Sequence, residues 1–241
     1  MTSSTGISKV FSAPLYLCGA RGLCGAVGLC SAVVLALWHA QAFAGAQRYE
    51  PLATSVRAAL HSAVADRASP RLVFATPDEG YQWLDEMSIR LVRRVPDQQT
   101  RLDLLTTVQY EAKRAGLDPQ LVLGLIEVES GFRKYAVSRA GARGYMQVMP
   151  FWLNLIGTGD HNLFNLRTNL RYGCVILRHY LDVERGDMTR ALARYNGSLG
   201  KKSNYPGKVL RAWETRWAWP GTGVRQISGK RPAIRYMGEP D

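Results

Sequence analysis

Cysteine and histidine are scarce in this chain, and their positions exclude several kinds of site. The 241 residues include four cysteines and four histidines, and three of the cysteines lie within the first 44 residues. Cys174 alone follows that stretch, so no intramolecular disulfide can form beyond it. His161 and His179 lack metal-ligand spacing with other histidine, cysteine or acidic residues, so we expect no metal. The chain also lacks a phosphate loop and a nucleotide fingerprint, and we expect no cofactor.

Acidic residues are also few. The chain holds 31 lysines and arginines against 19 aspartates and glutamates, a formal net charge of +12. Lys9 and Arg21 are the charged residues of the first 44, so the remainder keeps an excess of ten basic residues. This balance indicates an anionic partner, which is nucleic acid, a membrane surface or an acidic polymer. A solvated basic surface that binds nothing in particular fits the composition equally well.

The first 44 residues differ from the rest of the sequence. An apolar run covers residues 22–38, "GLCGAVGLCSAVVLALW", and Ala42-Phe43-Ala44 then fits the small-x-small pattern of signal cleavage. The run is short for a membrane span, which needs about 20 residues. We predict that residues 1–44 are a cleaved signal peptide, with an uncleaved inner-membrane anchor as the alternative. In both cases the protein is exported and periplasmic, and nucleic acid is not the expected partner.

Helical spacing of apolar residues dominates the rest of the chain. The predicted helices cover residues 51–66, 78–94, 97–115, 119–130, 165–184 and 188–196, and a last helix opens at Pro206. Pro51 is the expected first residue of the first helix. Residues 131–150, rich in glycine and small residues, predict a loop or a short hairpin. The predicted fold class is therefore mainly α.

Two acids interrupt the apolar stretch "GLIEVESGF", residues 124–132. Glu129 shares a helix face with Leu125 and Ile126 and lies in the last turn before a glycine-containing loop. Desolvation there is expected to raise the pKa of the carboxyl group, as a general acid requires. The alternatives are a partly exposed helix-terminal glutamate or one paired with an arginine.

Glu127 points nearly opposite to Glu129 on the same predicted helix. We expect Glu127 to pair with a nearby base such as Arg143 or to lie on a solvated edge.

The sequence from Glu129 onward resembles the catalytic domain of the soluble-type lytic transglycosylases. The resemblance rests on "ESGFRKYAVSRAGARGYMQVMP" (129–150), on Asn169 and Gly173, and on "ALARYNGSLG" (191–200). In that family a helix ends in Glu-Ser, followed by a Ser-x-x-Gly-Ala-x-Gly-Leu-Met-Gln-x-Met-Pro loop, an Asn-x-x-x-Gly helix and an Ala-x-x-x-Tyr-Asn-Ala-Gly turn. The match covers about residues 115–215.

The resemblance implies a lysozyme-like fold of the goose-type lysozyme and transglycosylase kind. It divides the chain into a catalytic domain at 115–218, a helical extension at 45–114 and a flexible basic tail at 219–241. Members of the family cleave the β-1,4 bond between N-acetylmuramic acid and N-acetylglucosamine in peptidoglycan glycan strands without using water. By this likeness, Glu129 protonates the leaving oxygen and then, as a carboxylate, takes the proton of the muramyl C6 hydroxyl.

The resemblance also implies a set of substrate-binding residues. These are Ser138, Tyr145, Gln147, Met149, Tyr195 and Asn196. Tyr195 is expected within reach of the catalytic carboxyl group, whereas Asn196 fixes a turn. Core packing is the alternative for Met149 and Tyr195, and Tyr145, which replaces the usual leucine, either stacks on a sugar or packs.

The chain departs from the family near its last helix, where Lys201 and Lys202 stand in place of an acidic pair. We expect this change to alter a subsite for the charged peptide stem.

Three other functions stay open at this point. One is a lysozyme-like hydrolase that uses water, and another is a non-catalytic wall-binding protein that keeps the fold. The third is a basic polymer-binding protein, which is motivated by charge alone and predicts binding that weakens steeply with salt.

Overall fold

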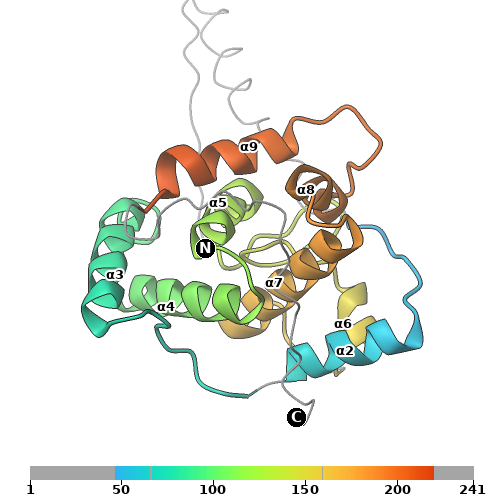
Figure 1. The fold of residues 1–241 in the computed structure, drawn as a ribbon, viewed down its shortest axis with the longest axis horizontal. Coiled ribbons are helices and arrows are strands. Elements are labelled where there is room, and N and C mark those ends of the chain that lie inside the picture. Colours follow the sequence, from blue (N-terminus) through green and yellow to red (C-terminus); the bar gives the residue numbers. More distant parts are fainter. Residues whose placement is uncertain (1–46, 66, 159, 220–241) are drawn as a thin grey trace, which may run out of the picture. The chain divides into compact units, whose positions relative to one another are not determined.

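Helices make up most of the part of the chain that the structure describes (Figure 1). The computed structural model describes residues 47–65, 67–158 and 160–219. The signal peptide or anchor expected at residues 1–44, and the tail from residue 220 onward, lie outside these ranges. The chain divides into two units after Gln41, and every described residue belongs to the second unit.

The described ranges hold eight α-helices and one π-helix, and they contain no strand. The helices are α2 (Thr54–Ala65), α3 (Pro77–Leu91), α4 (Gln98–Arg114), α5 (Pro119–Ser130), α6 (Phe151–Ile156), α7 (Leu166–Val183), α8 (Met188–Asn196), α9 (Tyr205–Ala212) and the π-helix η1 (Trp213–Trp217). Two isolated bridges, Val137 to Arg143 and Arg143 to Val148, fold residues 131–150 into a short hairpin. The prediction of a mainly α fold is confirmed.

Helix α5 is fixed at both ends by local sequence. The Asp118 side chain accepts a hydrogen bond from the backbone N–H of Gln120, and Pro119 occupies the first turn. At the other end Gly131 has φ 58°, a left-handed conformation that glycine adopts without steric cost. These caps place Glu129 in the last turn of the helix, as expected.

Helices α9 and η1 lie against α5, with α9 across it in Figure 1. Gly124 permits this approach, because a Cβ atom at this position would lie 2.9 Å from the backbone nitrogen of Trp213. The rest of α5 is buried on nearly every side, which explains its almost uniformly apolar sequence. The close packing brings the start of α9 toward the acid-bearing end of α5.

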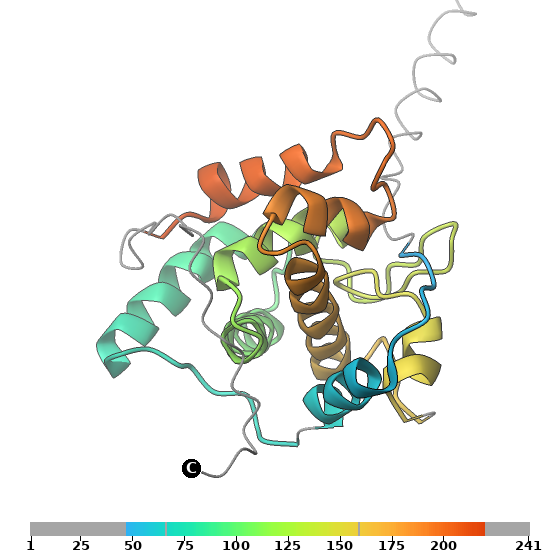
Figure 2. The ribbon, with the colours of Figure 1, turned by 45° about the vertical axis from the view of Figure 1, so that its right-hand side comes forward.

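Helix α7 connects the remaining elements. Figure 2 shows α7 between α8 at one end and α2 at the other, and it also packs against α4. Apolar residues of α2, α3 and α4, such as Val64, Trp83 and Leu104, join the same hydrophobic core as α5 and α7. The helices before residue 115 thus support the core that carries Glu129.

Two expectations about helices differ from the structure. Helix α2 begins at Thr54 and not at Pro51. Residues 47–53 form no regular structure, and Gln47, Tyr49 and Glu50 contact other parts of the fold. Helix α6 was not predicted, since its six residues are too few to show helical periodicity.

Candidate active site

Glu129 is almost entirely buried, with an exposed fraction of 3 %. The hydroxyl group of Tyr205, the first residue of α9, donates a hydrogen bond to its Oε1 atom at 2.5 Å. Hydrogen bonds from neutral donors to a charged acceptor are short and strong, so this contact orients the carboxyl group. The packing of α9 on α5 therefore creates a defined environment for one acid.

A second phenol, that of Tyr195 in α8, lies fully buried near Glu129. Its hydroxyl group donates to the backbone carbonyl of Met146 at 2.8 Å. Burial raises the pKa of both Tyr195 and Tyr205 well above the ordinary value of 10, and the negative charge of Glu129 raises it further. Both phenols hence stay protonated at neutral pH, and Tyr205 donates to the acid while Tyr195 donates to the Met146 carbonyl.

Asn169 of α7 anchors the hairpin that follows Glu129. Its side-chain oxygen accepts from the N–H of Met146 at 2.8 Å, and its amide nitrogen donates to the carbonyls of Arg143 and Leu163 at 2.8 and 2.9 Å. One turn later, Gly173 lies directly against the Met146 side chain, where a Cβ atom would collide. This geometry explains the Asn-x-x-x-Gly pattern, which holds the hairpin to the helix.

Gln147 stabilises the hairpin from within. Its backbone adopts φ 48°, and its buried side-chain amide donates to the carbonyls of Ala136 and Gly144 at 3.1 and 2.9 Å. The amide thus closes the turn within the hairpin at residues 131–150. A role in lining a groove stays a prediction for this residue.

Gln47 braces the same hairpin from the segment before α2. Its side chain, 3 % exposed, donates to the Gln147 carbonyl at 3.1 Å and accepts from the Met149 N–H at 2.9 Å. Two further contacts hold the segment, an edge-on stack of Tyr49 on Phe151 and an ion pair of Glu50 with Arg194 at 2.8 Å. Sequence patterns gave no sign of this brace, because it joins residues about a hundred positions apart.

The other residues implied by the resemblance lie on the hairpin or on α8. Ser138 is half-buried and accepts from the Ala142 N–H at 3.1 Å, which closes the tip of the hairpin. Tyr145 is buried, and burial raises the pKa of its phenol. Met149 is half-buried and packs against the core, whereas Asn196 is 8 % exposed at the end of α8. Their contacts with a sugar stay predictions.

Glu127 does not pair with Arg143. It accepts hydrogen bonds from Arg94 at 2.7 Å, from Arg216 at 3.0 Å and from the indole of Trp217 at 2.7 Å. Arg143 instead places its guanidinium group 5.9 Å from the ring centre of Phe164. The expectation that Glu127 pairs with a base is confirmed, but Arg143 as the base is wrong, because Glu127 faces η1 and the turn after α3. Helical periodicity does not reveal which elements cover a helix face.

Tyr205 is the site residue that sequence reasoning missed. The signal available was a tyrosine directly before Pro206 at the start of the last predicted helix, which by itself is an ordinary pattern. Only the packing of α9 on α5 brings its hydroxyl group to Glu129.

Residues 106–212 match the family described as "Transglycosylase SLT domain". This part of the chain is therefore similar to SLT domains. It begins inside α4 and ends at the last residue of α9, so it contains Glu129, the hairpin at 131–150 and Tyr205. Over the ranges that the structure describes, the chain holds no group of three or more histidine, cysteine or acidic side chains able to bind a metal ion.

Similar proteins carry transglycosylase names. A "Transglycosylase" of Enterobacteria phage PRD1 is 31 % identical over 132 residues, which are 52 % of this chain and 49 % of the phage protein. "Membrane-bound lytic murein transglycosylase C" of Actinobacillus pleuropneumoniae serotype 5b (strain L20) is 56 % identical over 119 residues, 46 % of this chain and 33 % of that protein. Its namesake in Glaesserella parasuis serovar 5 (strain SH0165) is 54 % identical over 120 residues, with the same two shares. The chain thus spans a third to a half of the length of these relatives.

Proposed function

We propose that this protein is a peptidoglycan lytic transglycosylase with Glu129 as its general acid and base. The observation that carries the proposal is the buried carboxyl group of Glu129, held by the Tyr205 hydroxyl at 2.5 Å beside the hairpin of the SLT domain. The substrate is the β-1,4 bond between N-acetylmuramic acid and N-acetylglucosamine.

A single acid suffices for this reaction. Glycosidases that use water or a covalent intermediate employ two carboxyl groups. Here Glu129 is the one acid among the site residues, the others being Ser138, Tyr145, Gln147, Met149, Tyr195, Asn196 and Tyr205. The nucleophile is the muramyl C6 hydroxyl, which belongs to the substrate and so attacks at a high effective concentration.

In the proposed reaction Glu129 gives up one proton and then takes up another. The protonated carboxyl group first donates to the oxygen of the leaving N-acetylglucosamine as the bond to muramyl C1 breaks. The resulting carboxylate then takes the proton of the C6 hydroxyl as its oxygen bonds to C1, which gives a 1,6-anhydro end. Tyr205 holds the carboxyl group in position during both steps.

We further propose a location in the cell envelope, where peptidoglycan lies. The names of the two bacterial relatives describe membrane-bound proteins. The finer expectation is an exported, periplasmic protein that is associated with a membrane through residues 22–38. Within the described ranges, no helix is long and apolar enough to cross a bilayer.

Mass analysis of muropeptides released from purified peptidoglycan tests the proposed reaction. We expect products with 1,6-anhydro ends, which are one water lighter than reducing ends. Products with reducing ends would make the protein a hydrolase. No release, with intact binding to peptidoglycan, would make it a wall-binding protein. Glu129→Gln is the control that assigns the release to this chain and not to a contaminating enzyme.

A further inference from the structure

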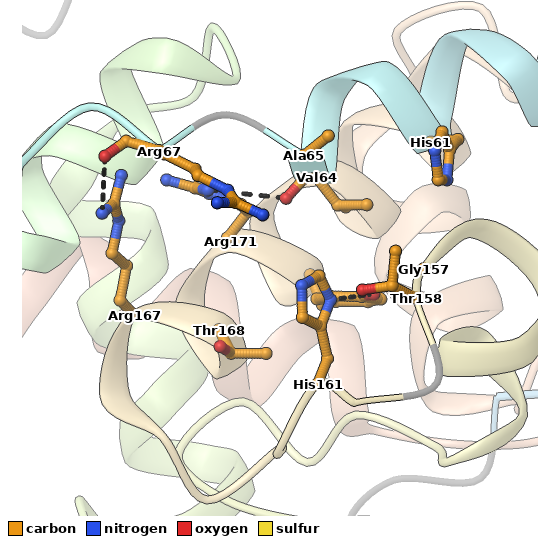
Figure 3. A pocket seen from close by; sticks show the side chains of 11 residues that line it. His61, Val64, Ala65, Arg67, Gly157, Thr158, His161, Arg167, Thr168 and Arg171 are labelled. Carbon is orange, nitrogen blue, oxygen red and sulfur yellow. Dashed lines mark hydrogen bonds between the residues drawn. The ribbon is translucent and has the colours of Figure 1, made fainter.

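A separate cavity of about 200 Å³ lies where the end of α2 meets the start of α7 (Figure 3). Its lining comes from α2, from the segment after α6 and from α7, and it includes none of the residues implied for sugar binding. The polar lining residues are His61, Arg67, Thr158, His161, Arg167, Thr168, Arg171 and Tyr172. The SLT match gives no role to this cavity.

Positive charge is in excess around this cavity. Arg67, Arg167 and Arg171 line it, and Arg114 pairs at 3.0 Å with Glu111, which also pairs with Arg171. The opposing charges are Glu111, which is fully buried and pairs with Arg171 at 2.9 Å, and Asp160, whose charge interacts with Arg67 and His161. Four guanidinium groups thus face two carboxylates. Like charges repel strongly where water is partly excluded, so the arrangement favours a further anion.

Arg167 and Arg171 are held in place before any ligand arrives, whereas Arg67 is exposed. Arg167 donates to the carbonyls of Arg67 and Ala68, and Arg171 donates to the carbonyl of Val64 at 3.4 Å. In Figure 3 the arginines lie on one side of the opening, and Thr158 and His161 lie on the other. The Nδ1 atom of His161 is fixed by the hydroxyl group of Tyr172 at 2.7 Å. Fixed guanidinium groups lose little freedom on binding, which favours affinity.

We propose that this cavity binds one oxyanion group, a carboxylate or a phosphate, at Arg67, Arg171 and His161. Guanidinium groups match the planar forks of carboxylates and the oxygens of phosphates. If the proposed function holds, the carboxylates of the peptide stem of peptidoglycan are one source of the ligand, and free phosphate is the other. In that case the cavity binds a carboxylate of the peptide stem, and the site at Glu129 cleaves the glycan strand.

Binding is measured by NMR titration of the full chain with inorganic phosphate and with muramyl tripeptide, each at ionic strength matched by chloride. We expect saturable shifts centred on His161 and Thr168. Arg67→Gln should weaken binding at least tenfold. Arg57→Gln removes the same charge from an exposed position of α2 outside the cavity and should leave binding unchanged.

The two ligands distinguish the two sources of the oxyanion, which are the peptide stem and free phosphate. Tighter binding of muramyl tripeptide than of its carboxyl-amidated form identifies the stem, whereas equal or tighter binding of phosphate identifies phosphate. Shifts spread over surface lysines and arginines, or equal affinities of Arg67→Gln and wild type, would overturn the proposal. Glu129→Gln should bind like wild type, so a failure here is distinct from a failure of the proposed reaction.

Discussion

Glu111 and Glu129 are two buried glutamates on consecutive helices, with opposite surroundings. Glu111 in α4 is fully buried among guanidinium groups, with Arg114 at 3.0 Å, Arg171 at 2.9 Å and Arg167 at 3.7 Å. Glu129 in α5 instead accepts a hydrogen bond from the phenol of Tyr205, and the phenol of Tyr195 lies nearby. Burial alone therefore does not mark a catalytic acid. A carboxylate fixed by permanent positive charges holds helices together, whereas one among neutral donors can exchange a proton.

Loss of the Glu129 carboxyl group should have the largest effect on activity. We expect Glu129→Gln to slow muropeptide release about a thousandfold, because a positioned acid and base contributes on that scale. The unfolding temperature should change little, since glutamine can still accept the Tyr205 hydrogen bond. The rates come from muropeptide release and the unfolding temperature from circular dichroism. A variant as active as wild type would refute the role of Glu129.

Loss of the Glu111 carboxyl group should instead lower stability. We expect Glu111→Gln to cost about 3–5 kcal/mol of unfolding free energy, because the buried guanidinium group of Arg171 loses its counter-charge. Denaturant unfolding measures this cost. Activity per folded molecule should be retained at low temperature. A stable but inactive Glu111→Gln protein would break the comparison, since it would give Glu111 a catalytic role.

Removal of the Tyr205 hydroxyl group should test whether a neutral donor beside Glu129 supports catalysis. Tyr205→Phe deletes the hydrogen bond to Glu129, and bonds to charged groups are worth about 1.5–3 kcal/mol. We therefore expect a decrease in kcat of about tenfold to a hundredfold. The pH optimum should move as well, since the hydrogen bond that Tyr205 donates favours the ionised form of the carboxyl group. An unchanged pH profile together with full activity would show that Tyr205 only packs.

The phenols should also make the fold sensitive to alkali. Burial raises the pKa of Tyr172 to about 12, and Tyr195 and Tyr205 lie well above 10. In the unfolded chain a phenol titrates near pH 10, at about its unperturbed value. From there to about pH 12 the unfolded chain holds fewer protons than the folded one, so stability falls as pH rises. Below that range these groups should not change stability.

The loss of stability is checked by measuring the unfolding midpoint and the phenolate absorbance between about pH 10 and about pH 12. We expect part of the phenolate signal to appear only when the chain unfolds. Titration of every tyrosine near pH 10 in the folded protein would contradict it.

The smallest effect is expected at Glu127, which combines charged partners with partial exposure. Its side chain is 10 % exposed, but those of Arg94 and Arg216 are 40 % and 45 % exposed. Solvent screens such pairs, so Glu127→Gln should cost about 1 kcal/mol. Muropeptide release should not change, which makes Glu127→Gln the matched control for Glu129→Gln, two residues away on the same helix.

Local sequence patterns predicted most of the helices but few of the contacts between them. The caps at Asp118 and Gly131 set the ends of α5, and they placed Glu129 correctly. The family resemblance then singled out the hairpin and Asn169. Tyr205 and Gln47 could not be found this way, because each meets the site across a large separation in sequence. Helical periodicity tells which face is buried, but it does not tell which element covers that face.

The contacts of Gln47 bear on how the protein should be shortened for study. The SLT domain match starts at residue 106, so a fragment cut at that boundary would lose the amide that spans Gln147 and Met149, together with α2, α3 and part of α4. Such a fragment would keep every residue that the family pattern names while lacking the brace on the hairpin at residues 131–150. A working minimal enzyme should therefore start no later than Gln47.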